Sequence, residues 1–171
     1  MGETSSILYE VERGRARITL NRPEKCNALS LALLTEMSEA LWDADADREV
    51  HSVILRGAGK CFSAGYDLTE GPSRAGKRGG ASYRGGRSID DDIWQLERSQ
   101  RLRMAIFDMH KPVLAQVHGH CLAGGTDVAL LCDMVIAADD ASFSVSEAKF
   151  GILPAVYGVG REPATDGDAS R

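Results

Sequence analysis

The sequence predicts an α/β protein in which helices cover a sheet, and three observations support this class. Residues 53–55 (Val-Ile-Leu) form a short apolar run followed by Gly57-Ala58-Gly59, which is typical of a strand buried on both faces. Apolar residues alternate with polar ones between residues 7 and 20, as they do in strands. Apolar residues recur at helical spacing over residues 33–42 and 93–106.

Composition limits the classes of function. The chain has 171 residues and 43% hydrophobic content, which suits one globular domain, and its net charge of -5 disfavours a general attraction to nucleic acid or to an anionic membrane. No apolar run approaches the roughly 20 residues that span a bilayer, and residues 1–6 lack the features of a signal peptide. We therefore expect a cytoplasmic protein with no nucleic-acid or membrane partner.

The first elements are a hairpin and a helix. Residues 7–20 contain two alternating stretches separated by Gly14, and residues 21–25 (Asn-Arg-Pro-Glu-Lys) form a turn. Ser30 is suited to cap a helix that ends near Asp47. The expected apolar face of this helix consists of Leu33, Leu34, Met37, Leu41 and Trp42.

The second half alternates helices with strands. Residues 71–87 hold six glycines and five Lys or Arg residues, so we expect a mobile loop. A helix is predicted over 93–109, and Lys111-Pro112 ends it before a strand at 113–117. A glycine turn at 119–125, a short buried helix at 127–132 and a strand at 134–137 follow. Residues 1–160 are expected to form the core, and residues 161–171 a frayed tail.

Two glycine-containing segments are candidates for binding an anion. Residues 61–68 (Cys-Phe-Ser-Ala-Gly-Tyr-Asp-Leu) and 119–127 (Gly-His-Cys-Leu-Ala-Gly-Gly-Thr-Asp) can each expose backbone N–H groups. Two such donors aimed at one point form an oxyanion hole, which stabilises negative charge on a carbonyl oxygen. The alternative is that these glycines only form tight turns between strands and helices.

Two carboxylates are candidates for proton transfer. Asp127 falls in the first turn of its predicted helix, where the helix N-terminus favours the ionised form, and Glu147 follows twenty residues later. Two carboxylates in one pocket can divide acid and base roles. The alternative is a helix-capping residue and an unrelated surface carboxylate.

Four motifs, in order and spacing, resemble the enoyl-CoA hydratase/isomerase (crotonase) superfamily over about residues 8–160. They are Asn21-Arg-Pro-Glu-Lys25 with Asn27-Ala-Leu29, Phe62-Ser-Ala-Gly-Tyr-Asp-Leu68, Lys111-Pro112 leading to Ala123-Gly-Gly125, and Glu147 with Gly151 and Pro154. The resemblance implies a crotonase-like spiral of ββα turns, with two roughly perpendicular sheets surrounded by helices. It also implies a chain that lacks the C-terminal helices of the family, and homotrimers or hexamers if the full-length fold is completed.

The resemblance also implies residue roles. The N–H groups of Tyr66 and Gly124 would form the oxyanion hole for a thioester carbonyl. Asp127 falls where hydratases of the family carry their first catalytic glutamate, and Glu147 falls on the second. The residues implied in binding coenzyme A and the substrate are Lys25, Asn27, Ala28, Leu29, Ala64, Gly65, Asp67 and Leu68.

The implied activity is hydration of an enoyl-CoA. One carboxylate would take a proton from the attacking water, and a carboxyl group would protonate the α-carbon. Aspartate in place of glutamate withdraws the carboxylate by about 1.5 Å, which weakens the case for hydration. An enoyl-CoA isomerase, a hydroxyacyl-CoA dehydratase and a non-catalytic, truncated chain of the same family stay open. Coenzyme A would enter as part of the substrate, and no metal or redox cofactor is implied.

Other interpretations have less support. The arginines and glycines at 77–87 resemble RNA-binding segments, but only one aromatic residue lies among them. His118 and His120 have a spacing compatible with zinc but no obvious third ligand. Ser63 lies in no nucleophile motif of the serine hydrolases. The four cysteines are far apart, and we expect reduced, mostly buried thiols.

Overall fold

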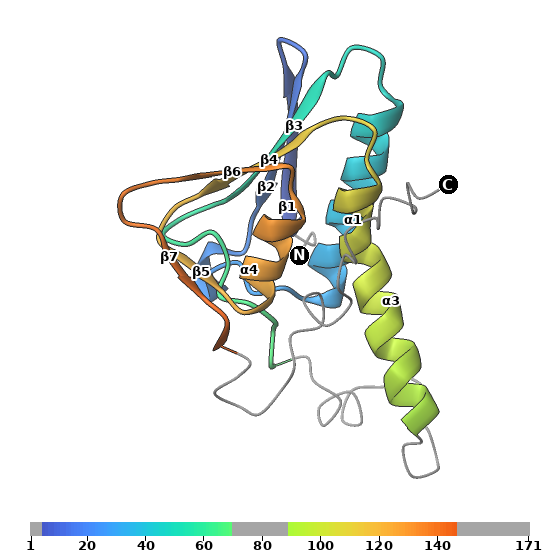
Figure 1. The fold of residues 1–171 in the computed structure, drawn as a ribbon, viewed down its shortest axis with the longest axis vertical. Helices are drawn as coiled ribbons and strands as arrows, with labels where there is room; N and C mark the ends of the chain where they lie inside the picture. Colours follow the sequence, from blue (N-terminus) through green and yellow to red (C-terminus); the bar gives the residue numbers. More distant parts are fainter. Residues whose placement is uncertain (1–4, 70–88, 147–171) are drawn as a thin grey trace, which may run out of the picture.

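The computed structural model describes residues 5–69 and 89–146, which form two sheets and three α-helices (Figure 1). The five-stranded sheet has the order β1 (Ile7–Glu12), β2 (Arg15–Leu20), β3 (Ser52–Gly57), β4 (Val113–Val117) and β6 (Met134–Ala137). β1 and β2 are antiparallel, and the other pairs are parallel. The smaller sheet pairs β5 (His120–Leu122) with β7 (Ser142–Ser144) in parallel.

The helices lie on one side of the large sheet. α1 (Leu31–Ala46) and α3 (Ile89–Asp108) pack against each other, and α4 (Gly124–Leu131) contacts α3, β5 and β6 (Figure 1). A short 3-10 turn, η1 (Pro23–Lys25), joins β2 to the segment that leads into α1. The α/β class and the layering of helices on a sheet are therefore as predicted.

The large sheet buries the face that meets the helices. Along β3, Val53 and Leu55 are fully buried, whereas Ile54 between them is only partly buried. The prediction that this strand is buried on both faces was therefore wrong, because the described residues cover only the helix-facing side of the sheet. The core on that side includes Ala16, Ile18, Leu20, Leu33, Met37, Leu41, Val113 and Ala115.

The N-terminus of α1 is capped as predicted. The Ser30 hydroxyl accepts a hydrogen bond of 3.1 Å from the Leu33 amide, and the helix ends at Ala46 with Asp47 as its C-cap. Trp42 departs from the prediction, because its side chain is 46% exposed. Leu41, also predicted on this face, is fully buried, and the adjacent residue on a helix points about 100° away from it.

Element boundaries differ from the predictions in three places. β5 lies within the residues predicted to be a glycine turn, and α4 begins at Gly124 rather than Asp127. A three-residue strand is too short to show periodicity, and glycine disfavours a helix in isolation. α3 begins at Ile89 rather than at residue 93. The predictions for residues 71–87 and 161–171 lie outside the described residues.

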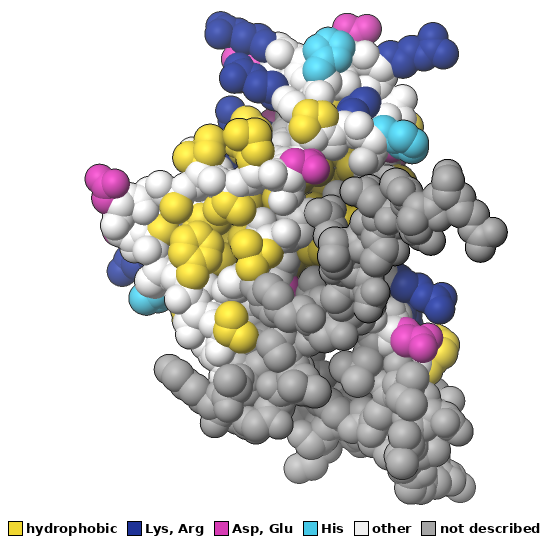
Figure 2. Space-filling view, in the orientation of Figure 1, with side chains coloured by type: hydrophobic (Ala, Val, Ile, Leu, Met, Phe, Trp, Pro, Cys, Tyr) yellow, Lys and Arg dark blue, Asp and Glu magenta, His cyan; other side chains and the backbone are white. Residues whose placement is uncertain are grey.

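Apolar side chains are exposed along β6 and β7. Met134 and Ile136 of β6 and Leu130 of α4 are more than half exposed, and Phe143 of β7 is 44% exposed. Hydrophobic side chains gather over this part of the molecule in Figure 2. Within residues 5–69 and 89–146, no helix is both long and apolar enough to cross a membrane.

Candidate active site

Backbone hydrogen bonds place the first glycine-containing segment along β5. The amides of Phe62 and Ser63 donate to the carbonyls of His118 and His120 at 2.9 and 3.0 Å, and the Leu122 amide donates to the Ser63 carbonyl at 2.9 Å. Because these bonds bring residues 61–63 alongside residues 118–122, the two segments that follow also lie together.

The glycines of the two segments meet at close range. A Cβ atom on Gly65 would lie 2.9 Å from Cβ of Ala123 and 3.4 Å from the amide nitrogen of Gly124. A Cβ atom on Gly124 would lie 2.6 Å from Cζ of Tyr66. A side chain at Gly65 would meet the backbone carbonyl oxygen of Leu122 at 2.9 Å, and one at Gly124 would displace the Tyr66 ring. Gly65 also has a positive φ of 94°.

The backbone near Tyr66 is oriented by a parallel bridge to Leu29. The Leu29 amide donates to the Gly65 carbonyl at 2.7 Å, and the Asp67 amide donates to the Leu29 carbonyl at 3.0 Å. In such a bridge the central residue, here Tyr66, points its own amide to the opposite side. Gly124 is the first residue of α4, where amides have no acceptor within the helix. This arrangement can present two N–H donors to one carbonyl oxygen.

Ala123, which precedes α4, has a strained backbone. Its φ of 48° and ψ of -123° are unusual for a residue with a side chain. The Ala123 amide donates to the Ser144 carbonyl of β7 at 2.8 Å, and Oγ1 of Thr126 donates to the same carbonyl at 3.2 Å. The small sheet thus holds the turn that aims the amides of α4.

Asp127 is fully buried in the first turn of α4. Its Oδ2 accepts a hydrogen bond of 2.8 Å from the phenol of Tyr66. The partial positive charge of a helix N-terminus favours an ionised carboxylate at this position. Tyr66 and Asp127, both predicted site residues, are therefore in direct contact through their side chains.

Arg103 also belongs to this cluster, and the sequence analysis did not identify it. Its Nη1 donates to the Tyr66 phenol oxygen at 2.8 Å, and its side chain is 2% exposed. The sequence contains a signal for it, because Arg103 lies seven residues after Leu96 and three before Ile106, and at helical spacing these three residues share one face. A charged residue on that face indicates a buried polar contact.

Glu147, the second predicted carboxylate, lies outside the described residues. Its pairing with Asp127 therefore stays a prediction.

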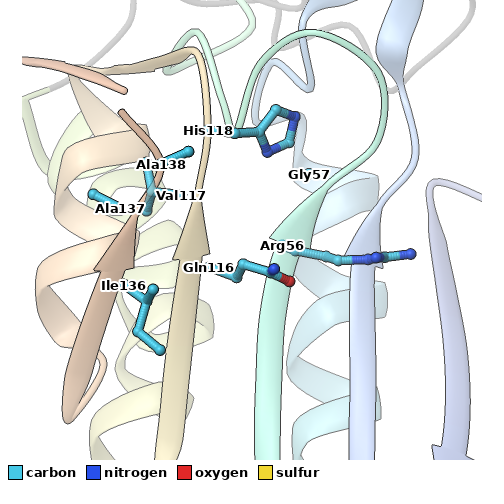
Figure 3. A pocket seen from close by; sticks show the side chains of 8 residues that line it. All are labelled: Arg56, Gly57, Gln116, Val117, His118, Ile136, Ala137 and Ala138. Atoms are coloured by element: carbon cyan, nitrogen blue, oxygen red, sulfur yellow. The ribbon is translucent and has the colours of Figure 1, made fainter. Parts of the chain in front are cut away.

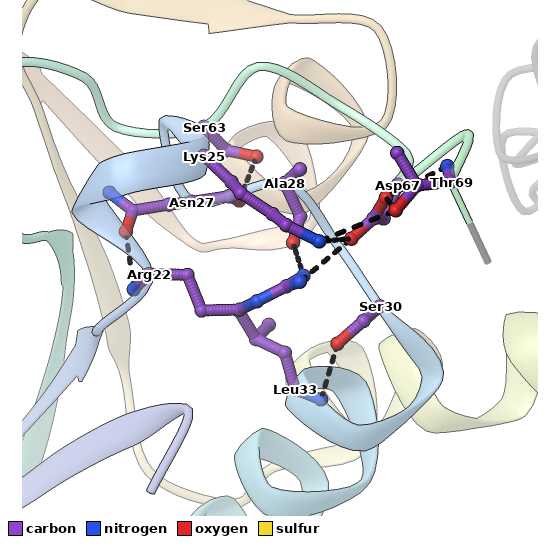
Figure 4. Close-up of polar contacts among 9 residues, drawn as sticks. All are labelled: Arg22, Lys25, Asn27, Ala28, Ser30, Leu33, Ser63, Asp67 and Thr69. Carbon is purple, nitrogen blue, oxygen red and sulfur yellow. Dashed lines mark hydrogen bonds and ion pairs between the residues drawn. The ribbon is translucent and has the colours of Figure 1, made fainter. Parts of the chain in front are cut away.

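The predicted coenzyme A segments are joined by an ion-pair cluster (Figure 4). Arg22 Nη2 lies 2.7 Å from Oδ2 of Asp67, and Lys25 Nζ lies 3.2 Å from the same oxygen. Arg22 Nη1 also donates to the Ala28 carbonyl. Burial opposes ionisation of Asp67, but hydrogen bonds from Thr69, Arg22 and Lys25 outweigh it and lower its pKa. Arg22 is a second residue that the sequence analysis did not single out.

The other predicted binding residues divide into two groups. Asn27 is fully buried, and its side chain bonds to the Arg22 amide and to the carbonyls of Ala58 and Cys61. Leu29 is buried as well. By contrast, the exposed or partly exposed residues are Ala28, Ala64 and Leu68, with Leu68 86% exposed. The second group is accessible to a ligand, whereas the first group holds the loop together.

The alternative sites have structural roles in the described part of the chain. Ser63 Oγ donates to the Asn27 carbonyl and accepts from the Gly65 amide. The rings of His118 and His120 contact the Gly59 carbonyl and the Ser142 hydroxyl, at 2.9 Å each. Among residues 5–69 and 89–146, no group of three His, Cys, Asp or Glu side chains is arranged to hold a metal.

The four cysteines are free thiols, and all except the half-buried Cys26 are buried, as predicted.

A pocket of about 300 Å³ lies at the ends of β3, β4 and β6 (Figure 3). Arg56, Gln116, His118 and Ile136 line it together with backbone and small side chains. None of the predicted site residues is part of its lining, so it is separate from the Tyr66 and Asp127 cluster.

The comparison with known proteins decides the family. The sequence profile of the enoyl-CoA hydratase/isomerase family matches residues 10–169. The chain belongs to this family. A crystal structure of an enoyl-CoA hydratase/isomerase from Xanthobacter autotrophicus Py2 is similar, with a TM-score of 0.74 and 43% identity over 86% of this chain and 51% of that one. The crotonase-like fold inferred from the resemblance is thereby confirmed.

Curated relatives within the family have different names. A "Probable enoyl-CoA hydratase" of Bacillus subtilis (strain 168) is 34% identical over 96% of this chain and 59% of its own length. The peroxisomal Delta(3,5)-Delta(2,4)-dienoyl-CoA isomerase of Arabidopsis thaliana is 35% identical over 90% of this chain and 55% of its own length. The chain thus spans somewhat more than half the length of these crotonase-family relatives.

Proposed function

We propose that the protein acts on acyl-CoA thioesters and hydrates a trans-2-enoyl-CoA. The observation that carries this proposal is the convergence of Gly65-Tyr66 with Ala123-Gly124, next to the buried carboxylate of Asp127. The amides of Tyr66 and Gly124 would bind the thioester oxygen. They would stabilise the enolate that forms when water adds to the β-carbon, by about 3 kcal/mol for each donor.

The proton transfers fall to two carboxyl groups. Glu147 would carry the main transfer and Asp127 would assist: one takes the proton of the attacking water, and the other protonates the α-carbon. The reaction changes no oxidation state overall, so we propose no redox cofactor, and no metal is needed if the two amides hold the charge. Coenzyme A enters only as part of the substrate.

The coenzyme A moiety would lie along residues 25–29 and 64–68. The exposure of Ala64 and Leu68 and the partial exposure of Ala28 support this placement. Lys25 already contacts Asp67 and Thr69, and its side chain is 42% exposed, so its ammonium can also face a phosphate. Asn27 and Leu29 would act by holding the loop in shape.

Isomerisation is the second candidate. The shorter side chain of Asp127, which weakens the case for hydration, is the observation that favours it, and a relative named as a dienoyl-CoA isomerase is 35% identical. Both reactions pass through the same stabilised enolate. A hydroxyacyl-CoA dehydratase would use the same site in the reverse direction.

A cytoplasmic location and assembly into trimers or hexamers also stay proposals. The exposed apolar residues of β6 and β7 offer a surface for such assembly.

A thermal melt of the 171-residue chain, with and without excess crotonyl-CoA, tests binding first. Ligand at a hundredfold over its dissociation constant stabilises a folded site by about 2.7 kcal/mol, which raises the melting temperature. Turnover assays with crotonyl-CoA and a 3-enoyl-CoA then distinguish hydration from isomerisation. A cooperative melt that no thioester shifts would contradict the proposal for this chain and would favour the non-catalytic alternative.

A further inference from the structure

The buried guanidinium of Arg103 has an unusual environment. It lies on α3, and its side chain is 2% exposed. A buried charge is unfavourable unless it is paired or hydrogen-bonded. Within the described part of the chain, Arg103 forms no ion pair with a carboxylate, and its Nε has no hydrogen-bond partner. Its contacts are therefore concentrated on one group, the side chain of Tyr66.

The contact between Arg103 and Tyr66 has two components. Nη1 of Arg103 donates to the phenol oxygen at 2.8 Å, and the guanidinium carbon lies 5.1 Å from the centroid of the ring. The ring in turn packs against the backbone of Gly124, because a Cβ atom there would come within 2.6 Å of Cζ. Arg103 thus helps to hold the ring against the first residue of α4.

The contacts with Arg103 and Asp127 together agree with one direction of the phenol proton. A guanidinium can only donate hydrogen bonds, and an ionised carboxylate can only accept them. The phenol oxygen accepts from Arg103, so its proton is directed to Oδ2 of Asp127 at 2.8 Å. Donation by a cation to the phenol oxygen also strengthens the bond that the phenol donates.

We propose that Arg103 is a positioning residue for the carboxylate of Asp127 and acts through the phenol of Tyr66. By holding the ring in place and strengthening the hydrogen bond that the phenol donates, Arg103 sets the orientation of a side chain that is one methylene shorter than glutamate. The inference rests on the proposed function in one respect, namely that Asp127 takes part in proton transfer.

The test measures the contact between Tyr66 and Asp127 without relying on turnover. In protein labelled with ¹³C at tyrosine Cζ, the Tyr66 resonance is assigned by its absence in Tyr66→Phe. We expect Asp127→Asn to shift this resonance in the wild-type background. In an Arg103→Gln background we expect less than half of that shift, because the ring is no longer held in place and its hydrogen bond to residue 127 is weakened.

Two further variants make the result specific. Arg101→Gln is the matched control, since Arg101 lies two residues away on α3 with its side chain 81% exposed, and it should leave the full shift in place. Arg103→Lys retains the buried charge and replaces Arg103→Gln if that variant does not fold. It should also reduce the shift, because an ammonium lacks the planar fork of the guanidinium. A full-sized shift in a folded Arg103 variant would overturn the proposal.

The pH dependence of turnover separates this proposal from the proposed function. For an active chain, we expect Arg103→Gln to change the pH profile of kcat, with a change in KM of less than about threefold, whereas a purely structural role would lower stability and leave the profile unchanged. If the Asp127→Asn shift depends on Arg103 in a chain without turnover, the positioning role of Arg103 is supported and the proposed activity is contradicted. If the chain turns over but the shift does not depend on Arg103, only the positioning role is contradicted.

Discussion

The phenol of Tyr66 donates a hydrogen bond of 2.8 Å to Oδ2 of Asp127, although 61 residues separate the two along the chain. Tyr66 follows a glycine in a loop, and Asp127 lies in the first turn of a buried helix. The contact joins the residue proposed to bind the thioester oxygen to a residue proposed to transfer protons. Changes at either position should therefore affect the same step of the reaction.

Replacing Asp127 by asparagine should lower kcat for crotonyl-CoA hydration by about 10² to 10⁴-fold, the range typical for loss of an acid or base. The amide retains the shape of the side chain and can still accept from Tyr66, so the melting temperature should change by only a few degrees. Asp108→Asn, at the exposed end of α3, is the control and should retain full turnover. Unchanged kcat in Asp127→Asn would mean that this carboxylate exchanges no proton with the substrate.

Replacing Gly124 by alanine should decrease the free energy of unfolding by about 1–3 kcal/mol, as expected for overpacking. The reason is the 2.6 Å approach of the new Cβ to Cζ of Tyr66. Denaturant unfolding of Gly124→Ala, Tyr66→Ala and the double variant measures this coupling. The loss caused by Gly124→Ala should largely disappear in the Tyr66→Ala background. Additive losses would show that the ring does not constrain residue 124.

Arg22→Met should destabilise the fold more than Lys25→Met at neutral pH. Both side chains contact Asp67, but the Arg22 side chain is 13% exposed and that of Lys25 is 42% exposed. Water screens the more exposed pair, so we expect a loss of about 2–4 kcal/mol for Arg22→Met and less than about 1 kcal/mol for Lys25→Met. Chemical unfolding of both variants checks the order, and equal losses would contradict it.

The stabilisation by Asp67 should depend on pH in one direction. The pKa of Asp67 is lowered in the folded state, so its contribution is complete above the pKa of about 3.9 of an unfolded aspartate. The contribution is lost as the pH falls from there toward the lower folded pKa. The difference in stability between wild type and Asp67→Asn should therefore be constant from pH 6 to 8 and shrink below about pH 4. A difference that grows in acid would contradict the assigned direction.

Thiol alkylation should distinguish the cysteines. Burial raises the pKa of Cys121 to about 11 and that of Cys132 to about 12, so at pH 8 only about one thiol in a thousand or fewer is ionised at either position. Cys26 is half-buried and should react first with iodoacetamide under native conditions. Peptide mass spectrometry over time checks this order. Equal labelling of Cys26 and Cys132 in folded protein would contradict the burial of α4 and its C-terminus.

The sequence alone was sufficient for the local elements with strong periodicity. The hairpin at residues 7–20, the capped helix after Ser30 and the strands at 113–117 and 134–137 lie where they were predicted. Each of these is specified by residues close in sequence: alternation for strands, a hydroxyl before an apolar face for the helix. The motifs also sufficed to indicate the family, since four of them occur in the right order.

The sequence alone did not specify which distant segments of the chain lie side by side. β5 and the early start of α4 were missed because they depend on pairing with β7 and with residues 61–63, which lie far apart in the chain. The roles of Arg103 and Arg22 also depend on distant partners. The helical spacing indicates that Arg103 is buried but not that it contacts Tyr66, and no residue close to Arg22 in the sequence indicates its ion pair with Asp67. The pattern placed Trp42 on the apolar face of α1, but in the structure it lies beside that face and is 46% exposed. Whether such a side chain is buried depends on how the neighbouring helix packs, not on the residue type alone.

The sequence by itself determined the fold class, the glycine-containing segments and the identity of the charged side chains. Only the tertiary structure decided that Gly65-Tyr66 meets Ala123-Gly124, that the phenol of Tyr66 lies between Arg103 and Asp127, and that Asp67 is paired with Arg22. The physical reason is the distance along the chain over which each effect acts. Backbone propensity and periodicity act over a few residues, whereas close contacts and buried charges are settled by segments that the packed sheets and helices bring together.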